Sequence, residues 1–188
     1  MKIKKRLKEF FIQIIPVMVG VYLGFLVSDW SSNRQVAQKK EALLESLKAE
    51  IMENQSMIAS VLEYHEQLRD TAALYANKGV TRMPSFFGGV RTIPLTSSAF
   101  ETGIQTGLIN ELSIQEIQNL NRLYTHQQSY NDFSNLLLSG LMNIGYAPNE
   151  QSMRQIMQFL AISMTDVAIK EEKLLEEYEL ILSTHFKE

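Results

Sequence analysis

The sequence predicts an all-α protein: an N-terminal transmembrane helix that continues into an extracytoplasmic, up-down-up antiparallel helical bundle. Three observations lead to this prediction. The 18 residues of the apolar run 10–27 include one polar residue, Gln13. Residues 41–77 contain neither proline nor glycine and repeat apolar residues at heptad spacing. Three long segments of similar length are separated by two turn-rich stretches, which is typical of antiparallel bundles.

The apolar run is long enough to cross a membrane. As a helix, residues 10–27 span roughly 27 Å, close to the roughly 30 Å of a bilayer's hydrocarbon core. Aromatic residues at both ends suit the membrane–water interfaces, and basic residues flank the run. The predicted interfacial anchors are Lys4, Lys5, Arg6, Lys8, Phe10, Phe11, Trp30 and Arg34.

Charge is distributed unevenly along a chain whose net charge is −3. Residues 1–9 carry five basic residues and one acidic residue, whereas the remainder is acidic. The positive-inside rule then predicts a cytoplasmic tail at 1–9, a transmembrane helix at 10–30 and a periplasmic or otherwise extracytoplasmic bundle at 31–188. A basic tip on an acidic body favours contact with the lipid bilayer and argues against nucleic acid as a ligand.

Two other interpretations of this segment fit its pattern less well. A cleaved signal peptide would share the basic start, but the apolar run is longer than usual and no A-x-A-like cleavage site follows it. A buried helix of a soluble protein would not explain the charge pattern. We therefore expect an uncleaved anchor.

Small residues and a proline recur at every fourth position of the apolar segment: Pro16, Gly20, Gly24 and Ser28. Such a face lets a second helix approach closely, so these four residues are the predicted surface for helix packing in the membrane. The partner would be a second copy of the chain or another membrane-protein subunit. The plainer alternative is that glycine is simply common in membrane helices.

Turn and breaker residues divide the rest of the chain. The predicted bundle has long helices at about 31–77, 113–143 and 149–186, and a short helix at about 98–107. Ser98 with Glu101, and Ser113 with Glu116, have the spacing of capping boxes at helix starts. Gly107 is the predicted stop of the short helix.

The heptad of the first bundle helix includes two polar residues. The a positions are Leu44, Ile51, Ile58, His65 and Ala72, and the d positions are Leu47, Asn54, Val61, Leu68 and Tyr75. His65 is then either a buried residue with a local hydrogen bond or a pH-sensitive point. Asn54 either sets the register between helices or faces water. In the last helix, Glu171 interrupts an otherwise apolar seam.

Residues 78–97 are predicted to be irregular, because three glycines and two prolines interrupt them. Phe86 and Phe87 precede a glycine pair in this stretch. An aromatic pair on a glycine-rich loop can bind a partner, so the two residues form a possible partner loop. More often, such residues fold back to cover the end of a bundle.

No catalytic, cofactor or metal motif stands out. The chain has no cysteine, which excludes disulfides, thiolate metal ligands and a cysteine nucleophile. None of the three histidines follows a glutamate at the spacing of a bundle di-metal site. We therefore expect no enzyme activity, no cofactor and no bound metal.

Two functions remain. The leading hypothesis is protein–protein contact, as an accessory subunit of a membrane assembly or as a homo-oligomer. The alternative is a sensory or small-ligand-binding bundle that signals through a partner, with its ligand near Tyr124, Tyr130, His126 or His65.

Two stretches resemble a family of small single-pass bacterial inner-membrane proteins with no known activity. The first is V-G-V-Y-L-G-F-L-V-S-D-W-S-S-N-R-Q followed by E-A-L-L-E-S-L-K-A-E-I-M-E-N, and the second is S-A-F-E-T-G-I-Q-T-G-L-I-N at 98–110. The residues that fit are Trp30, Arg34, Leu43, Leu44, Leu47 and Lys48. The chain departs from the family pattern at 28–29 and 31–32. The resemblance covers about residues 10–130 and implies location and topology only.

Overall fold

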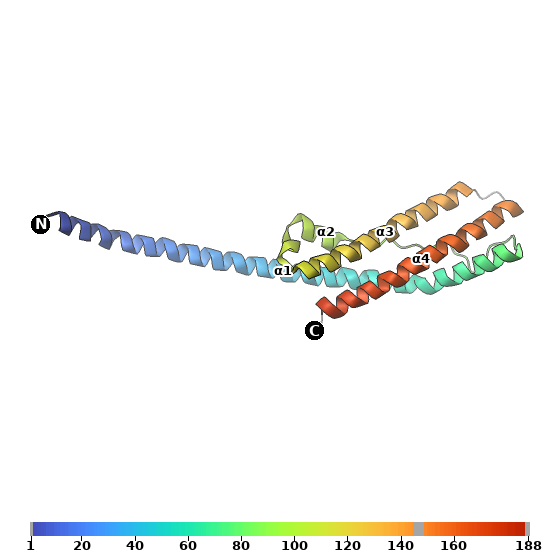
Figure 1. The fold of residues 1–188 in the computed structure, drawn as a ribbon, viewed down its shortest axis with the longest axis horizontal. Coiled ribbons are helices and arrows are strands. Elements are labelled where there is room, and N and C mark those ends of the chain that lie inside the picture. Colours follow the sequence, from blue (N-terminus) through green and yellow to red (C-terminus); the bar gives the residue numbers. More distant parts are fainter. Residues whose placement is uncertain (1, 145–148, 187–188) are drawn as a thin grey trace. The chain divides into compact units, whose positions relative to one another are not determined.

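The computed structural model describes residues 2–144 and 149–186, with residues 2–13 described as helical backbone only. Within this part every regular element is a helix, so the all-α prediction is confirmed (Figure 1). The elements are α1 (Lys2–Lys78), α2 (Ser98–Gln105), the 3₁₀ helix η1 (Leu108–Glu111), α3 (Ile114–Ile144) and α4 (Glu150–His185). Most of the turn predicted at 143–149 lies outside the described residues.

The chain forms two compact units, residues 1–43 and 44–188. The boundary falls within α1, which is one continuous helix with Pro16 inside it. No proline or glycine lies between Trp30 and Lys40, which accounts for the continuity. The predicted membrane helix and the first predicted bundle helix are therefore parts of one element.

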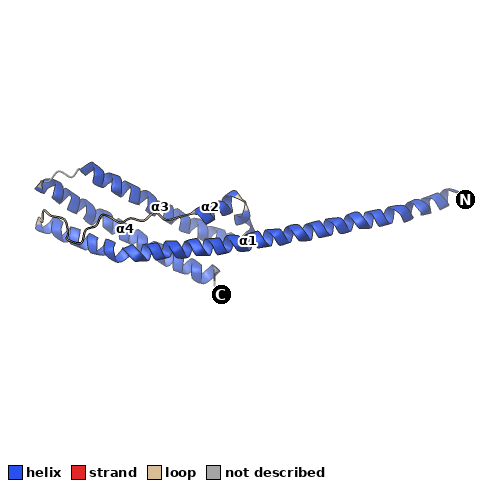
Figure 2. Ribbon diagram, turned by 180° about the vertical axis from the view of Figure 1, so that it is seen from behind, coloured by secondary structure: helices blue, strands red, loops and turns tan. Residues whose placement is uncertain are grey.

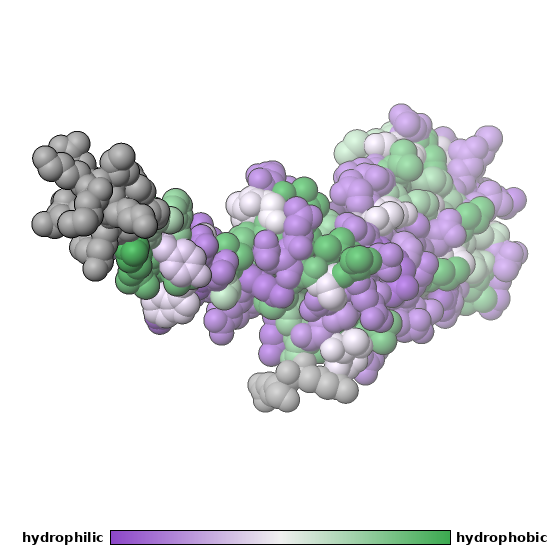
Figure 3. Space-filling view, turned by 60° about the vertical axis from the view of Figure 1, so that its left-hand side comes forward, coloured by the Kyte–Doolittle hydropathy of each residue, from purple (hydrophilic) through white to green (hydrophobic). Residues whose placement is uncertain are grey.

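The first unit is a helix with an apolar surface. Its large apolar side chains from Ile15 to Trp30 are exposed, between 47 and 66 % of their surface each. Figure 3 shows apolar side chains at the surface next to the residues drawn in grey. By length and composition, α1 is the one helix in the described part of the chain that could cross a membrane.

The second unit packs the remainder of α1 against α3 and α4 around an apolar core (Figure 2). The predicted seam of α1 is buried, except for Leu44 and Tyr75, which are half-buried. Most of the apolar seam of α4 is buried as well, with Met157, Met164 and Tyr178 fully enclosed. Heptad spacing alone identified these residues because each helix buries one face.

Hydrogen bonds between the helices give their directions. Asn119, His126 and Tyr130 of α3 bond to His185, Glu177 and Glu171 of α4, so these two helices are antiparallel. Tyr124 and Gln127 of α3 instead bond to Glu50 and Asn54 of α1, so α1 and α3 run in the same direction.

The predicted up-down-up order is therefore wrong. The segment that returns along α1 is not a helix but the extended stretch 79–97, which precedes α2 (Figure 1). The hydrogen bonds of this stretch and of the start of α2 follow α1 backwards: Val90 pairs with His65, Thr96 with Asn54, and Ala99 of α2 with Glu50. An extended chain covers about 3.3 Å per residue against 1.5 Å in a helix, so a short stretch can span a long helix.

Side chains of α1 and α3 hold the backbone of this extended stretch. The side-chain amide of Asn54 donates to the Thr96 carbonyl at 2.8 Å, and its oxygen accepts from the Thr96 N–H at 3.1 Å. Asn131 of α3 pairs in the same way with the N–H and carbonyl of Leu95, at 3.0 and 2.9 Å. Gln127 donates to the Thr96 carbonyl as well, at 2.5 Å. Two helices thus supply the hydrogen bonds that a neighbouring strand would give.

One capping box formed and the other did not. The Ser113 hydroxyl accepts from the Glu116 N–H, and the Glu116 carboxylate accepts from the Ser113 N–H at 2.7 Å, as predicted. At the start of α2, Ser98 is already helical and Ser97 is the N-cap residue, without a side-chain cap bond. The Glu50 carboxylate accepts from the second N–H of α2 instead, so a tertiary contact replaces the local cap. Gly107 ends α2 in the left-handed region, at φ +74°.

We expect Asn54→Leu to destabilise the protein by about 2 to 4 kcal/mol, because the fully buried Asn54 amide is the partner of both the Thr96 backbone and the buried Gln127 side chain. Gln67→Leu, at an exposed position of the same helix, should change stability by less than about 0.5 kcal/mol. Urea unfolding of the full-length chain in detergent, followed by circular dichroism, measures both. Equal losses in the two variants would contradict the assigned role of Asn54.

Candidate functional site

The most buried polar group of the bundle joins α1, α3, α4 and the extended stretch. His65 and Glu171 are each fully enclosed, and the His65 Nδ1 lies 2.8 and 2.9 Å from the two Glu171 carboxylate oxygens. Tyr130 donates its hydroxyl to the same carboxylate at 2.9 Å. The His65 Nε2 lies 2.7 Å from the carbonyl of Val90. The predicted interruption of the α4 seam is therefore a core contact.

This geometry constrains the protons. A backbone carbonyl can only accept, so the His65 Nε2 must carry a hydrogen. One further proton lies between the His65 Nδ1 and Glu171, and the pair is electrically neutral as a whole whichever atom holds it. Burial, reinforced by the Glu171 carboxylate, raises the pKa of Tyr130 well above its ordinary value, so its hydroxyl stays a donor. The group thus holds the stretch at Val90 in place.

A second buried carboxylate supports the start of α2. Glu50 accepts from the Tyr124 hydroxyl at 2.7 Å and from the Ala99 N–H at 2.9 Å. Burial, followed by the effect of Glu50, raises the pKa of Tyr124 and keeps it a neutral donor. The Tyr124 ring also stacks on Phe100, with centroids 4.2 Å apart. A negative charge at a helix N-terminus is favourable, so these contacts fix α2 against α1 and α3.

Phe86 and Phe87 are both half-buried. Phe86 meets the Tyr64 ring edge-on, and the Tyr64 hydroxyl bonds to the backbone of Gly88 and Gly89. Arg91 has a positive φ of 53°, and its guanidinium carbon lies over the Tyr64 ring, 4.4 Å from the ring centroid. The loop is therefore folded onto α1, as in the covering role, and its use as a partner loop stays a prediction.

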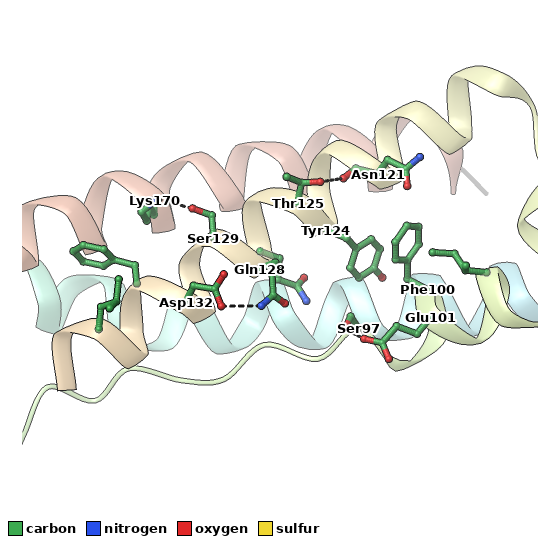
Figure 4. A pocket seen from close by; sticks show the side chains of 14 residues that line it. Ser97, Phe100, Glu101, Asn121, Tyr124, Thr125, Gln128, Ser129, Asp132 and Lys170 are labelled. Atoms are coloured by element: carbon green, nitrogen blue, oxygen red, sulfur yellow. Dashed lines mark hydrogen bonds between the residues drawn. The ribbon is translucent and has the colours of Figure 1, made fainter. Parts of the chain in front are cut away.

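A hollow of about 670 Å³ lies over the outward face of α3 (Figure 4). Phe100, Glu101 and Ile104 of α2 form one wall, and Lys170 of α4 closes the other. Among the hydrogen bonds drawn in Figure 4, Gln128 donates to Asp132 at 2.8 Å and Lys170 donates to Ser129 at 2.9 Å. Tyr124, one of the four residues predicted near a ligand, lines this hollow.

The other three predicted ligand neighbours lie elsewhere. His65 and Tyr130 belong to the buried group, whereas His126 lies at the surface between α3 and α4. The His126 Nδ1 is 2.7 Å from Glu177, and its Nε2 is 3.3 Å from the Lys173 ammonium. In the part of the chain that the structure describes, no three histidine, aspartate or glutamate side chains cluster as around a metal ion.

The predicted packing stripe of the apolar helix is open. Pro16, Ser28 and Trp30 are exposed, and a Cβ added at Gly20 or Gly24 would meet no atom within 4 Å. The Arg34 guanidinium lies 5.7 Å from the Trp30 ring centroid. The side chains of the anchors Lys4, Lys5, Arg6, Lys8, Phe10 and Phe11 lie outside the described residues.

Sequence reasoning placed His65 and Asn54 in the seam of the first bundle helix, left open whether Asn54 faces water, and missed the partners of both. Glu50, Gln127 and Asn131 are polar residues next to, or one helical turn from, apolar seam positions, and nothing local distinguishes them from solvent-facing ones. One signal was available: Glu171 is a carboxylate inside an apolar heptad seam, and His65 is a possible polar partner for it in the seam of another helix.

None of the family models, curated proteins or solved structures compared with the chain matches it. The family resemblance noted in residues 10–130 therefore stays a prediction.

We expect Glu171→Leu to cost about 3 to 5 kcal/mol of stability, because it leaves buried hydrogen-bonding groups on His65 and Tyr130 without a partner. Glu171→Gln should cost far less, since a glutamine amide can donate to the Nδ1 of a neutral His65 while its oxygen accepts from Tyr130. Glu172→Leu, at the exposed neighbouring position, is the control. Denaturant unfolding of the three variants tests the ranking, and equal losses for Gln and Leu would argue against the assigned hydrogen bonds.

Proposed function

We propose that the chain is a non-enzymatic, single-pass inner-membrane protein that acts through protein–protein contact. It works either as an accessory subunit of a membrane assembly or as a homo-oligomer. Residues 1–9 are cytoplasmic in this proposal, and residues 31–188 lie outside the cytoplasm. The contact surfaces are the small-residue stripe of the membrane helix and the outer faces of the bundle.

The observation that carries the proposal is the exposed apolar helix of the first unit. A helix that is apolar on all sides is stable where lipid or another protein covers it. On this helix Gly20 and Gly24 offer a backbone surface that no other side chain of the described chain approaches. Close approach of a second helix is what such a surface permits.

The hydrogen bonding inside the bundle supports a function that depends on contacts at the outer surface. Among the residues that the structure describes, every buried side-chain nitrogen and oxygen has a hydrogen-bond partner. The buried histidine, glutamates and tyrosines thus serve the fold, through the backbone of the extended stretch and of α2. Groups for recognition are accordingly expected on the surface of the bundle.

The orientation can be tested with single cysteines, because the chain has none of its own. We expect Lys78→Cys, at an exposed position of the bundle, to react with a membrane-impermeant maleimide added to spheroplasts. Lys5→Cys, in the predicted cytoplasmic tail, should react only after lysis. The opposite pattern would reverse the proposed orientation, and reaction of both sites before lysis would contradict a membrane-spanning helix.

Association can be tested by purifying the full-length chain from its native membrane in mild detergent and measuring native masses. We expect a complex of fixed stoichiometry, with itself or with another membrane protein. Gly20→Leu/Gly24→Leu should remove most of this complex, since two leucines block close backbone approach.

Met18→Leu/Tyr22→Leu is the matched control, because these residues have the same spacing on the opposite face of the helix. It should leave the complex intact. Recovery of a monomer from unmodified protein, or equal effects of the two double variants, would count against association through the glycine stripe.

A further inference from the structure

The hollow on α3 continues into a small recess between α3 and α4. The recess has a volume of about 60 Å³ and is lined by His126, Ser129, Lys170 and Lys173. Ser129 and Lys170 also line the larger hollow, so the two adjoin. The larger one, at about 670 Å³, is within the roughly 300 to 1,000 Å³ of small-molecule sites.

The recess concentrates positive charge. The Lys170 ammonium donates to Ser129 at 2.9 Å, and the Lys173 ammonium lies 3.3 Å from the His126 Nε2. Each ammonium group has three N–H donors and uses one of them in these contacts. Neither forms an ion pair within 4.0 Å in the described part of the chain, because Glu177 faces His126 and Arg122 instead. The ammonium groups of Lys170 and Lys173 therefore both line the recess, and each keeps N–H donors for a ligand.

The adjoining wall is apolar. The Lys170 ammonium lies 5.8 Å from the centroid of the Phe133 ring. Leu136, also on α3, keeps 68 % of its surface exposed, and Ile104, on the α2 wall across the hollow, keeps 51 %. A ligand that covered them would bury apolar area, which is favourable.

Two acidic residues of the hollow bear on the orientation of a ligand. Asp132 accepts from Gln128, and Glu101 accepts from the Ser97 hydroxyl. Each carboxylate repels an anionic group from its own surroundings in the hollow. The recess beside the two lysines is therefore the favourable place for such a group.

We propose that this surface binds a small amphipathic anion. Its carboxylate or phosphate head is held by Lys170, Lys173 and Ser129, with His126 beside it, and its apolar body lies over Phe133 and Leu136. This binding site is independent of the association proposed for the membrane helix.

The test is calorimetric titration of the full-length chain in phosphatidylcholine nanodiscs with 1-naphthyl phosphate, with empty nanodiscs as the blank. We expect one molecule to bind per chain. 1-Naphthol and inorganic phosphate should each bind at least about tenfold more weakly, because each lacks one half of the ligand. Lys170→Gln/Lys173→Gln should weaken binding of 1-naphthyl phosphate by at least about tenfold as well.

Lys78→Gln removes one charge at an exposed position outside this site and should leave binding unchanged. Lys170→Arg keeps the charge and should retain most of the affinity. No binding, equal weakening by Lys78→Gln, or inorganic phosphate binding as tightly as the naphthyl ester would overturn the proposal. Circular dichroism of each variant shows whether the bundle remains folded.

A second series in phosphatidylglycerol nanodiscs identifies the source of the ligand. Loss of 1-naphthyl phosphate binding there would support the site and assign it to an anionic lipid. Unchanged binding would support a soluble amphipathic anion.

Discussion

An extended backbone packed against a helical bundle has no neighbouring strand, and this bundle depends on how the N–H and carbonyl groups of that backbone are satisfied. A buried N–H or carbonyl without a partner costs as much as a lost hydrogen bond or more. Here the partners are side chains. Tyr64, His65, Asn54, Asn131 and Glu50 contact the backbone of residues 88–99 one after another. A wholly apolar core would pack three helices but would leave this segment unpaired.

The same side chains also connect the helices to each other. Gln127 bonds to Asn54 and Tyr178 as well as to Thr96, so one amide joins α1, α3, α4 and the extended stretch. His65 and Glu171 do the same one level further along the bundle. Because each group has several partners, the extended stretch and the three helices should form a cooperative structure rather than separate layers.

This arrangement separates the interior from the surfaces that we propose to act. The buried histidine, carboxylates and tyrosines are engaged in holding the chain, although their types would suggest chemistry in an open cleft. The proposed contacts lie elsewhere, on the apolar helix and in the hollow over the outward face of α3, beside Lys170 and Lys173. Exposed apolar area and donors that are not fully used are the physical features of these surfaces.

The sequence by itself determined which segments are helical, most of the buried seams of α1 and α4 and the apolar segment, because heptad spacing and breakers are local signals. The seam of α1, the capping box at Ser113 and the stop at Gly107 followed from neighbouring residues alone. The tertiary structure decided the direction of α3, the pairing of His65 with Glu171 and the replacement of a serine cap at Ser98 by Glu50. Segment length could not give the direction, because an extended stretch covers more than twice the distance per residue that a helix covers. The buried partners could not be predicted either, since a polar side chain beside a seam has the same local pattern whether it meets water or a distant backbone group.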